Sequence, residues 1–142
     1  MKVLVLNGPN LDRLGERAPD IYGSTTLAEL EDVLRARAAE LGVEVECLQS
    51  ADPSVLVGAI SQTDADAIVL NPAALTHYSG ALRDAVAGCT VPVYEVHISN
   101  IHAREPYRRR SLISPVARGT IIGLGVRGYL LALEAAVQEA TA

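Results

Sequence analysis

The chain has 142 residues, of which 49% are hydrophobic and 20% charged, and its formal net charge is -5. These values predict one compact domain over residues 1–142, and the acidic balance argues against a nucleic-acid partner. No apolar run is long enough to span a membrane, no signal-peptide pattern precedes the first strand, and two cysteines are too few for a disulfide framework. We therefore expect a cytoplasmic protein with no membrane partner.

Apolar runs alternate with helical patterns along the whole chain. The runs predict five strands, at 3–6, 43–48, 67–70, 91–96 and 120–122. Thr26 and Glu29 form a capping box ahead of a helix that ends before Gly42. Three further helices are expected, from Asp52-Pro53 through Ile60, from Ser79 through Val86, and over 130–137. This alternation predicts an α/β fold, a flavodoxin-like three-layer sandwich around a five-stranded parallel sheet.

The connection over residues 8–24 is long for so small a domain, and we expect no helix or strand in it. A structureless connection of this length is usually functional or disordered. It interleaves Leu11 and Leu14 with charged residues, which disorder does not favour, so we interpret it as a lid that closes over a site. The lid carries Arg17 and Tyr22. Taken alone, Tyr22 would be read as a packing aromatic.

Three of the predicted strands end in polar residues. Asn7 and Asn10 follow the first strand, Asn71 follows the third, and 95–100 closes the fourth. Ligands of open α/β sheets bind beyond the carboxyl ends of the strands, so we expect the functional site at this edge. Each asparagine alone would more simply be a turn residue or a helix cap.

Several common uses of this fold do not fit the sequence. Gly8, Gly15 and Gly23 are separated by bulky residues, which is not the pattern of a phosphate-binding loop. The only lysine, Lys2, begins the first strand, which makes imine catalysis very unfavourable. The histidines are not spaced as a metal site requires. We therefore expect no metal and no cofactor.

The polar positions of the lid and the strand ends resemble the type II 3-dehydroquinate dehydratases. The matching positions run through the whole chain: Asn7-Gly8-Pro9-Asn10-Leu11, Gly15, Arg17, Pro19, Tyr22-Gly23, Thr26-Leu27, Gln49-Ser50, Asn71-Pro72, Leu75-Thr76-His77, Ser79, Ala81-Leu82-Arg83-Asp84, 95–105, Arg108, Ser111 and 119–133. The resemblance implies the trans dehydration of 3-dehydroquinate to 3-dehydroshikimate, a shikimate-pathway reaction, through an enolate and without metal or imine.

The resemblance also assigns catalytic roles. Tyr22 would be the base that removes a proton from C2 of the substrate, and Arg17 would hold it as the phenolate. Asn10 would position a water against the developing oxyanion. His97 would be the general acid that protonates the departing C1 hydroxyl, oriented by Glu95 from the same face of the strand. Without the family context, an isolated histidine would be read as a satisfied core residue.

The remaining roles concern substrate binding and assembly. The backbone at Ile98 and Ser99, with the Ser99 hydroxyl, resembles the family's pocket for the substrate carboxylate. The ring hydroxyls would be bound by Asn71, His77 and Arg108, and a further cation, Arg104, is expected near Tyr22. Asp84 would reach the site of a neighbouring subunit, which implies a trimer-based homo-oligomer, commonly a dodecamer of four trimers.

The chain departs from the family pattern in places, of which the largest is Ala51-Asp52-Pro53-Ser54, where Asn-His-Glu-Gly is common. Smaller departures are Asp12, Ala18, Ala73 and Pro106-Tyr107. None removes a proposed catalytic group. Two alternatives remain open, a paralogue acting on a related cyclic polyol acid and a non-catalytic ligand-binding protein of the same fold.

Overall fold

A computed structural model describes all residues, 1–142. Its centre is one parallel sheet with the strand order β2-β1-β3-β4-β5. The strands are β1 (Lys2–Asn7), β2 (Glu44–Gln49), β3 (Ala67–Asn71), β4 (Val93–His97) and β5 (Gly119–Ile122). All five lie where the sequence predicts them, and the order is the flavodoxin-like one. The fourth strand begins two residues later than expected, after Pro92, which has no N–H to give to the ladder.

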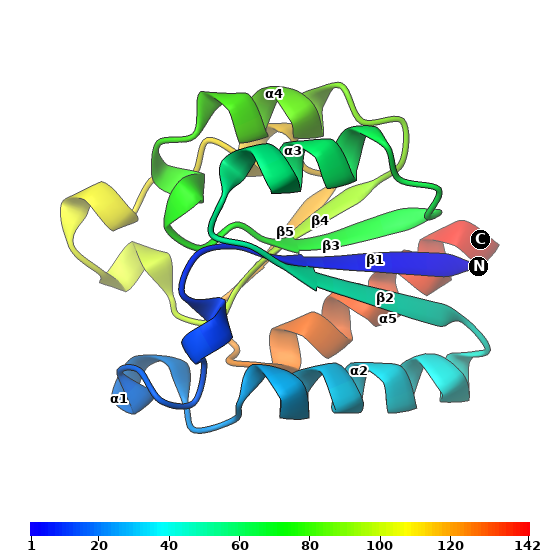
Figure 1. The fold of residues 1–142 in the computed structure, drawn as a ribbon, viewed down its shortest axis with the longest axis horizontal. Helices are drawn as coiled ribbons and strands as arrows, with labels where there is room; N and C mark the ends of the chain where they lie inside the picture. Colours follow the sequence, from blue (N-terminus) through cyan, green and yellow to red (C-terminus); the bar gives the residue numbers. More distant parts are fainter.

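Helices cover both faces of the sheet, as Figure 1 shows. One face carries α3 (Pro53–Ser61) and α4 (Gly80–Ala87), and the other carries α2 (Leu27–Leu41) and α5 (Arg127–Thr141). The predicted caps are present: Thr26 and Glu29 form the capping box of α2, and the side chains of Asp52 and Ser79 cap α3 and α4. The three-layer sandwich is therefore confirmed. Helix α5 extends beyond the expected range of 130–137 at both ends. The prediction was shorter because the residues at the two ends of the helix lack an apolar repeat.

Side chains alternate between the two faces of each strand and build two apolar cores. Val3 and Val5 of β1 face α2 and α5, whereas Leu4 and Leu6 face α3 and α4. The same alternation continues to the carboxyl ends of the strands. Polar side chains at the ends of the strands can therefore reach the same region beyond the sheet from either of its faces.

The lid over 8–24 is not structureless, which corrects the expectation from the sequence. It holds a short 3₁₀ helix (Leu11–Arg13) and the single-turn helix α1 (Pro19–Tyr22). Leu11 and Leu14 are buried in the core beside α2, which anchors the segment. Gly15 has φ +89°, and a Cβ on it would lie 2.8 Å from the carbonyl oxygen of Ser24, so glycine lets the middle of the lid pack against its C-terminal end.

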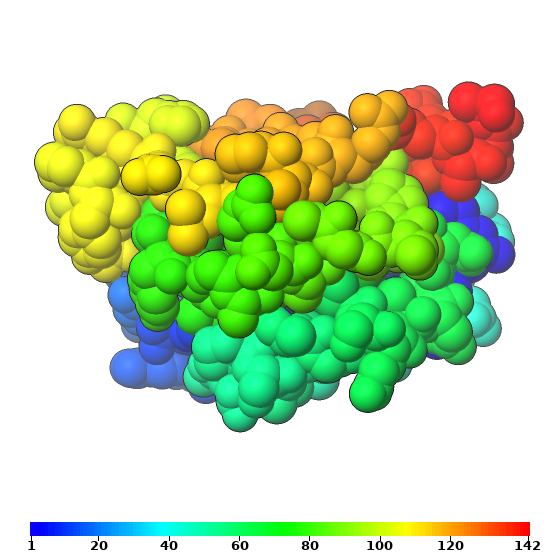
Figure 2. All heavy atoms as spheres, turned by 90° about the horizontal axis from the view of Figure 1, so that it is seen from above, coloured from blue at the N-terminus to red at the C-terminus, as the bar shows by residue number.

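The carboxyl ends of the strands open at one end of the molecule. There the lid and the segment around residues 100–110 project beyond the sheet, while both termini lie at the opposite end (Figures 1 and 2). No helix has the length and apolar character needed to cross a membrane.

Candidate active site

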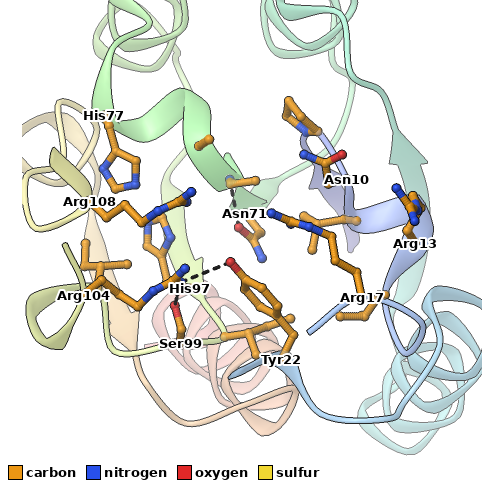
Figure 3. Close-up of a pocket in the computed structure, with 17 residues that line it drawn as sticks. Asn10, Arg13, Arg17, Tyr22, Asn71, His77, His97, Ser99, Arg104 and Arg108 are labelled. Atoms are coloured by element: carbon orange, nitrogen blue, oxygen red, sulfur yellow. Dashed lines mark hydrogen bonds between the residues drawn. The ribbon is translucent and has the colours of Figure 1, made fainter. Parts of the chain in front are cut away.

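A cavity of about 760 Å³, part of it open to solvent, lies beyond the carboxyl ends of β1, β3 and β4. Of the ten residues to which the resemblance gives a catalytic or substrate-binding role, nine line it: Asn10, Arg17, Tyr22, Asn71, His77, His97, Ile98, Ser99 and Arg108. Arg104, expected near Tyr22, lines it as well. Figure 3 shows His77, Arg104 and Arg108 on one side, Asn10, Arg13 and Arg17 on the other, and Tyr22 and Asn71 between them.

Tyr22, at the C-terminal end of α1, is surrounded by guanidinium groups. Arg104 donates a hydrogen bond from Nη1 to the Tyr22 hydroxyl at 3.1 Å and another to the Ser99 hydroxyl at 3.2 Å (Figure 3). The guanidinium carbon of Arg17 lies 5.5 Å from the centroid of the Tyr22 ring. The cation that touches the phenolic oxygen is therefore Arg104, while Arg17 lies over the ring face at cation–π distance.

His97 and Glu95 form a buried pair on the face of β4 toward α3 and α4. His97 Nε2 lies 2.6 Å from Glu95 Oε2, and the two residues are 5% and 0% exposed. Burial alone raises the pKa of Glu95, but the hydrogen bond and charge of His97, with hydroxyl donors, lower it to about 2. A carboxylate only accepts, so His97 donates from Nε2, and Nδ1 is the nitrogen left for the cavity.

The hydroxyl donors to Glu95 were not predicted as part of the site. Thr76 and Ser111 each donate to Oε2 at 2.7 Å, and Ser114 donates to Oε1. These residues lie 16 to 19 positions from Glu95 in the chain, so no local spacing relates them to it. In the sequence, Thr76 directly precedes His77, and Ser111 and Ser114 follow Arg108 within six positions.

The far side of the cavity is formed by His77 and Arg108. His77 Nδ1 lies 2.7 Å from the carbonyl oxygen of Arg110, so this nitrogen carries the proton and donates. Burial lowers the pKa of His77, which leaves it neutral near pH 7 with Nε2 free. Arg108 donates to Glu105 at 2.7 Å and Arg104 to the same residue at 3.4 Å, so one carboxylate outside the cavity holds both arginines.

The cavity is strongly cationic. Four arginines line it, at positions 13, 17, 104 and 108, and no aspartate or glutamate does. Arg13 was not predicted as a site residue, although it precedes Arg17 by four positions, about one helical turn. Such a cavity favours an anionic ligand, and more so a state of that ligand in which negative charge increases. No group of three or more His, Cys, Asp or Glu side chains is arranged to hold a metal ion.

Asp84, the tenth predicted residue, lies outside the cavity. It is on α4, its side chain is 77% exposed, and its carboxylate accepts a hydrogen bond from Arg83 at 3.1 Å. This position is away from the strand-end site of its own chain, as the sequence led us to expect.

Comparison with known proteins gives one consistent result. The family model described as dehydroquinase class II matches residues 1–137. A protein from Pelotomaculum thermopropionicum named 3-dehydroquinate dehydratase is 54% identical over 138 residues, 96% of each chain. A namesake from Anoxybacillus flavithermus is 55% identical over 135 residues, 94% of this chain and 91% of the relative. The crystal structure of the type II dehydroquinase from Propionibacterium acnes superposes with a TM-score of 0.93 at 47% identity, covering 96% of both chains.

Proposed function

Since the chain belongs to the dehydroquinase class II family, we propose that the cavity is its active site, with Tyr22 as base and His97 as acid. The enzyme is a hydro-lyase that dehydrates 3-dehydroquinate to 3-dehydroshikimate in the shikimate pathway. The observation that carries the assignment of the site is that one cavity holds both a guanidinium-bound tyrosine hydroxyl and a carboxylate-bound histidine.

The first step is removal of a proton from C2 of the substrate by Tyr22 as phenolate. The phenolate is stabilised by Arg104, which donates to its oxygen at 3.1 Å, and by the nearby guanidinium of Arg17. One guanidinium about 4 Å from an anion contributes about 4 kcal/mol at an effective dielectric of ~20, before desolvation is subtracted. Both cations therefore stabilise the negative charge that the proposed base carries.

The electron pair of the broken C–H bond moves into the ketone and forms an enolate. A substrate that already carries a carboxylate thereby gains a second negative charge inside a cavity lined by four arginines. Asn10 positions a water against the enolate oxygen, and the backbone at Ile98 and Ser99, with the Ser99 hydroxyl, binds the substrate carboxylate. The donors are in place before charge develops, which is what lowers the barrier.

In the second step the enolate collapses, the C1–O bond breaks, and His97 protonates the departing hydroxyl, which leaves as water. The ionised Glu95 at 2.6 Å stabilises the protonated imidazole before it gives up its proton. Turnover ends when Tyr22 has lost the proton taken from C2 and His97 has regained one. Asn71, His77 and Arg108 hold the ring hydroxyls in the orientation that the elimination requires.

We further propose that the whole chain, 1–142, works as one catalytic domain in a homododecamer built from trimers. Support comes from Asp84, whose side chain is exposed on α4 and lies outside the cavity of its own chain. Tyr78 and Tyr107 are 67% and 61% exposed, as aromatic residues of an interface would be in a separated chain. Sedimentation should give about 180 kDa, twelve copies of the 15.0 kDa chain; a stable monomer with full activity would refute the assembly.

We also propose a cytoplasmic location. The two cysteines, Cys47 and Cys89, are both free thiols, which suits a reducing compartment. Fractionation of cells that produce the protein tests this directly.

The decisive experiment follows the conjugated enone of 3-dehydroshikimate by ultraviolet absorbance after the purified protein is mixed with 3-dehydroquinate. We expect rapid growth of the signal that neither a chelator nor borohydride suppresses, and loss of turnover with retained substrate binding in Tyr22→Phe. Tyr94→Phe is the matched control, because Tyr94 is buried and its hydroxyl donates to Glu139, away from the cavity. Normal turnover in Tyr22→Phe would exclude Tyr22 as the base.

A further inference from the structure

Three buried side chains behind the cavity are joined by hydrogen bonds into a relay, consisting of Asn71, Tyr129 and Asn7. Asn7 and Asn71 are register partners at the carboxyl ends of β1 and β3, and both point toward α5. Tyr129, from the first turn of α5, places its hydroxyl between the two amides. The exposed fractions are 0% for Asn7, 3% for Asn71 and 0% for Tyr129. Of the three, only Asn71 lines the cavity.

The hydrogen bonds of the relay can run in only one direction. The backbone N–H of Ala73 donates to Asn71 Oδ1 at 3.0 Å (Figure 3), and because an N–H only donates, this contact identifies the amide oxygen. Asn71 Nδ2 therefore faces Tyr129 and donates to its hydroxyl at 2.7 Å. The Tyr129 hydroxyl in turn donates to Asn7 Oδ1 at 2.6 Å.

The end of the relay shows that this direction is imposed on it. Asn7 Nδ2 is the one buried side-chain nitrogen or oxygen with no hydrogen-bond partner. If the relay ran the other way, Asn7 Nδ2 would donate to the Tyr129 hydroxyl, and that hydroxyl would donate to the side-chain oxygen of Asn71. This arrangement is excluded, because the Asn71 oxygen faces the N–H of Ala73 and the Asn71 nitrogen faces Tyr129. Burial raises the pKa of Tyr129, so the hydroxyl keeps the proton that the relay requires.

Asn71 Nδ2 has two N–H groups, and Tyr129 engages one of them. The second is the amide donor left for the cavity, and in Figure 3 the amide faces the space beside Tyr22. We propose that Tyr129 is a positioning residue that holds Asn71 with an N–H toward the substrate, so that Asn71 donates a hydrogen bond to a substrate oxygen. This inference rests on the proposed function and deepens it.

The test is a double-mutant cycle measured with 3-dehydroquinate on the complete chain. Tyr129→Phe should lower kcat/KM about tenfold, the effect of one hydrogen bond of ordinary strength, mainly by raising KM. Tyr94→Phe, which also removes a buried hydroxyl of the α5 side, should change kcat/KM less than twofold. In an Asn71→Ala background, Tyr129→Phe should have no further effect, because it acts through Asn71.

Asn7→Ala gives a second route to the same answer if Tyr129→Phe does not fold. It removes the acceptor at the end of the relay and should also lower kcat/KM in the wild-type background but not in Asn71→Ala. The positioning role would be overturned by equal losses of kcat/KM in the wild-type and Asn71→Ala backgrounds, or by wild-type kinetics in both Asn7→Ala and Tyr129→Phe. In either case, turnover by the wild-type protein would still support the proposed function. No turnover by the wild-type protein would overturn both.

Discussion

Replacing Glu95 by glutamine should remove a definite, pH-dependent part of the protein's stability. In the folded protein the carboxylate accepts hydrogen bonds from His97, Thr76, Ser111 and Ser114, which lower its pKa from an ordinary 4.5 to about 2. A difference of that size corresponds to about 3 kcal/mol, because a tenfold change in proton affinity is worth about 1.4 kcal/mol. Since the folded pKa is the lower one, this stabilisation is complete above about pH 4.5 and is lost as the pH falls toward 2.

The assay is urea unfolding of wild type and Glu95→Gln, followed by circular dichroism at one protein concentration and several pH values. Other carboxylates with lowered pKa values, such as Asp52 and Glu105, titrate in both proteins and cancel in the difference. The free energy of unfolding of wild type minus variant should begin to fall as the pH drops below about 5.5, where the carboxyl group of the unfolded chain starts to bind its proton. By about pH 3 it should have shrunk by about 2 kcal/mol.

A stability difference that stays the same down to pH 3 would refute this account of Glu95. It would mean that the carboxyl group binds its proton equally well in the folded and unfolded chains. The hydroxyl donors would then not hold Glu95 as an anion, and its stabilisation of protonated His97 would lose its basis. A difference that grew on acidification would contradict the predicted sign directly.

Three further predictions test other parts of the molecule. His97→Ala should slow formation of the enone more than exchange of the C2 proton with deuterated solvent, and equal losses would argue for a concerted elimination or a structural role. Arg104→Ala should lower kcat by at least about tenfold, because it removes the donor to Tyr22, while Arg35→Ala, an exposed arginine of α2 outside the cavity, should change kcat little. Thr26→Ala should lower the free energy of unfolding by about 1 kcal/mol in a urea titration, because α2 loses its cap.

Most of the fold follows from local patterns in the sequence. The strands are continuous apolar runs because both faces of a parallel sheet are buried, and the helix caps are local hydrogen bonds between residues two or three apart. The short helices of the lid could not be predicted in this way. Helix α1 spans only Pro19–Tyr22, less than the length over which a helical repeat is visible, and its N-cap, Ala18, has a left-handed φ of 44° that alanine does not signal.

As with the fold, the parts of the site that depend on local sequence could be predicted, and those that depend on contacts between distant residues could not. The sequence places Asn71 and His97 at one edge of the sheet because strand ends are readable, and it places Tyr22 on the lid. The roles of all three remain predictions carried by the family resemblance. What the sequence does not show is which groups touch. The contact between Arg104 and Tyr22, which only the family resemblance led us to expect, joins residues 82 positions apart. The contact between Tyr129 and Asn7, which was not expected, joins residues 122 apart. Only the packed structure brings such pairs together.

The two halves of the site are supported from opposite faces of the sheet. Glu95 and His97 occupy alternate positions of β4, and Glu95 accepts from hydroxyl donors on the α3 and α4 side. Asn71 receives its support from Tyr129 of α5. The side chains that meet the substrate converge at the strand ends, but their supports are separated by the sheet itself. The acid and the hydroxyl-binding amide are therefore held independently, and a parallel sheet covered on both faces makes this possible in a chain of only 142 residues.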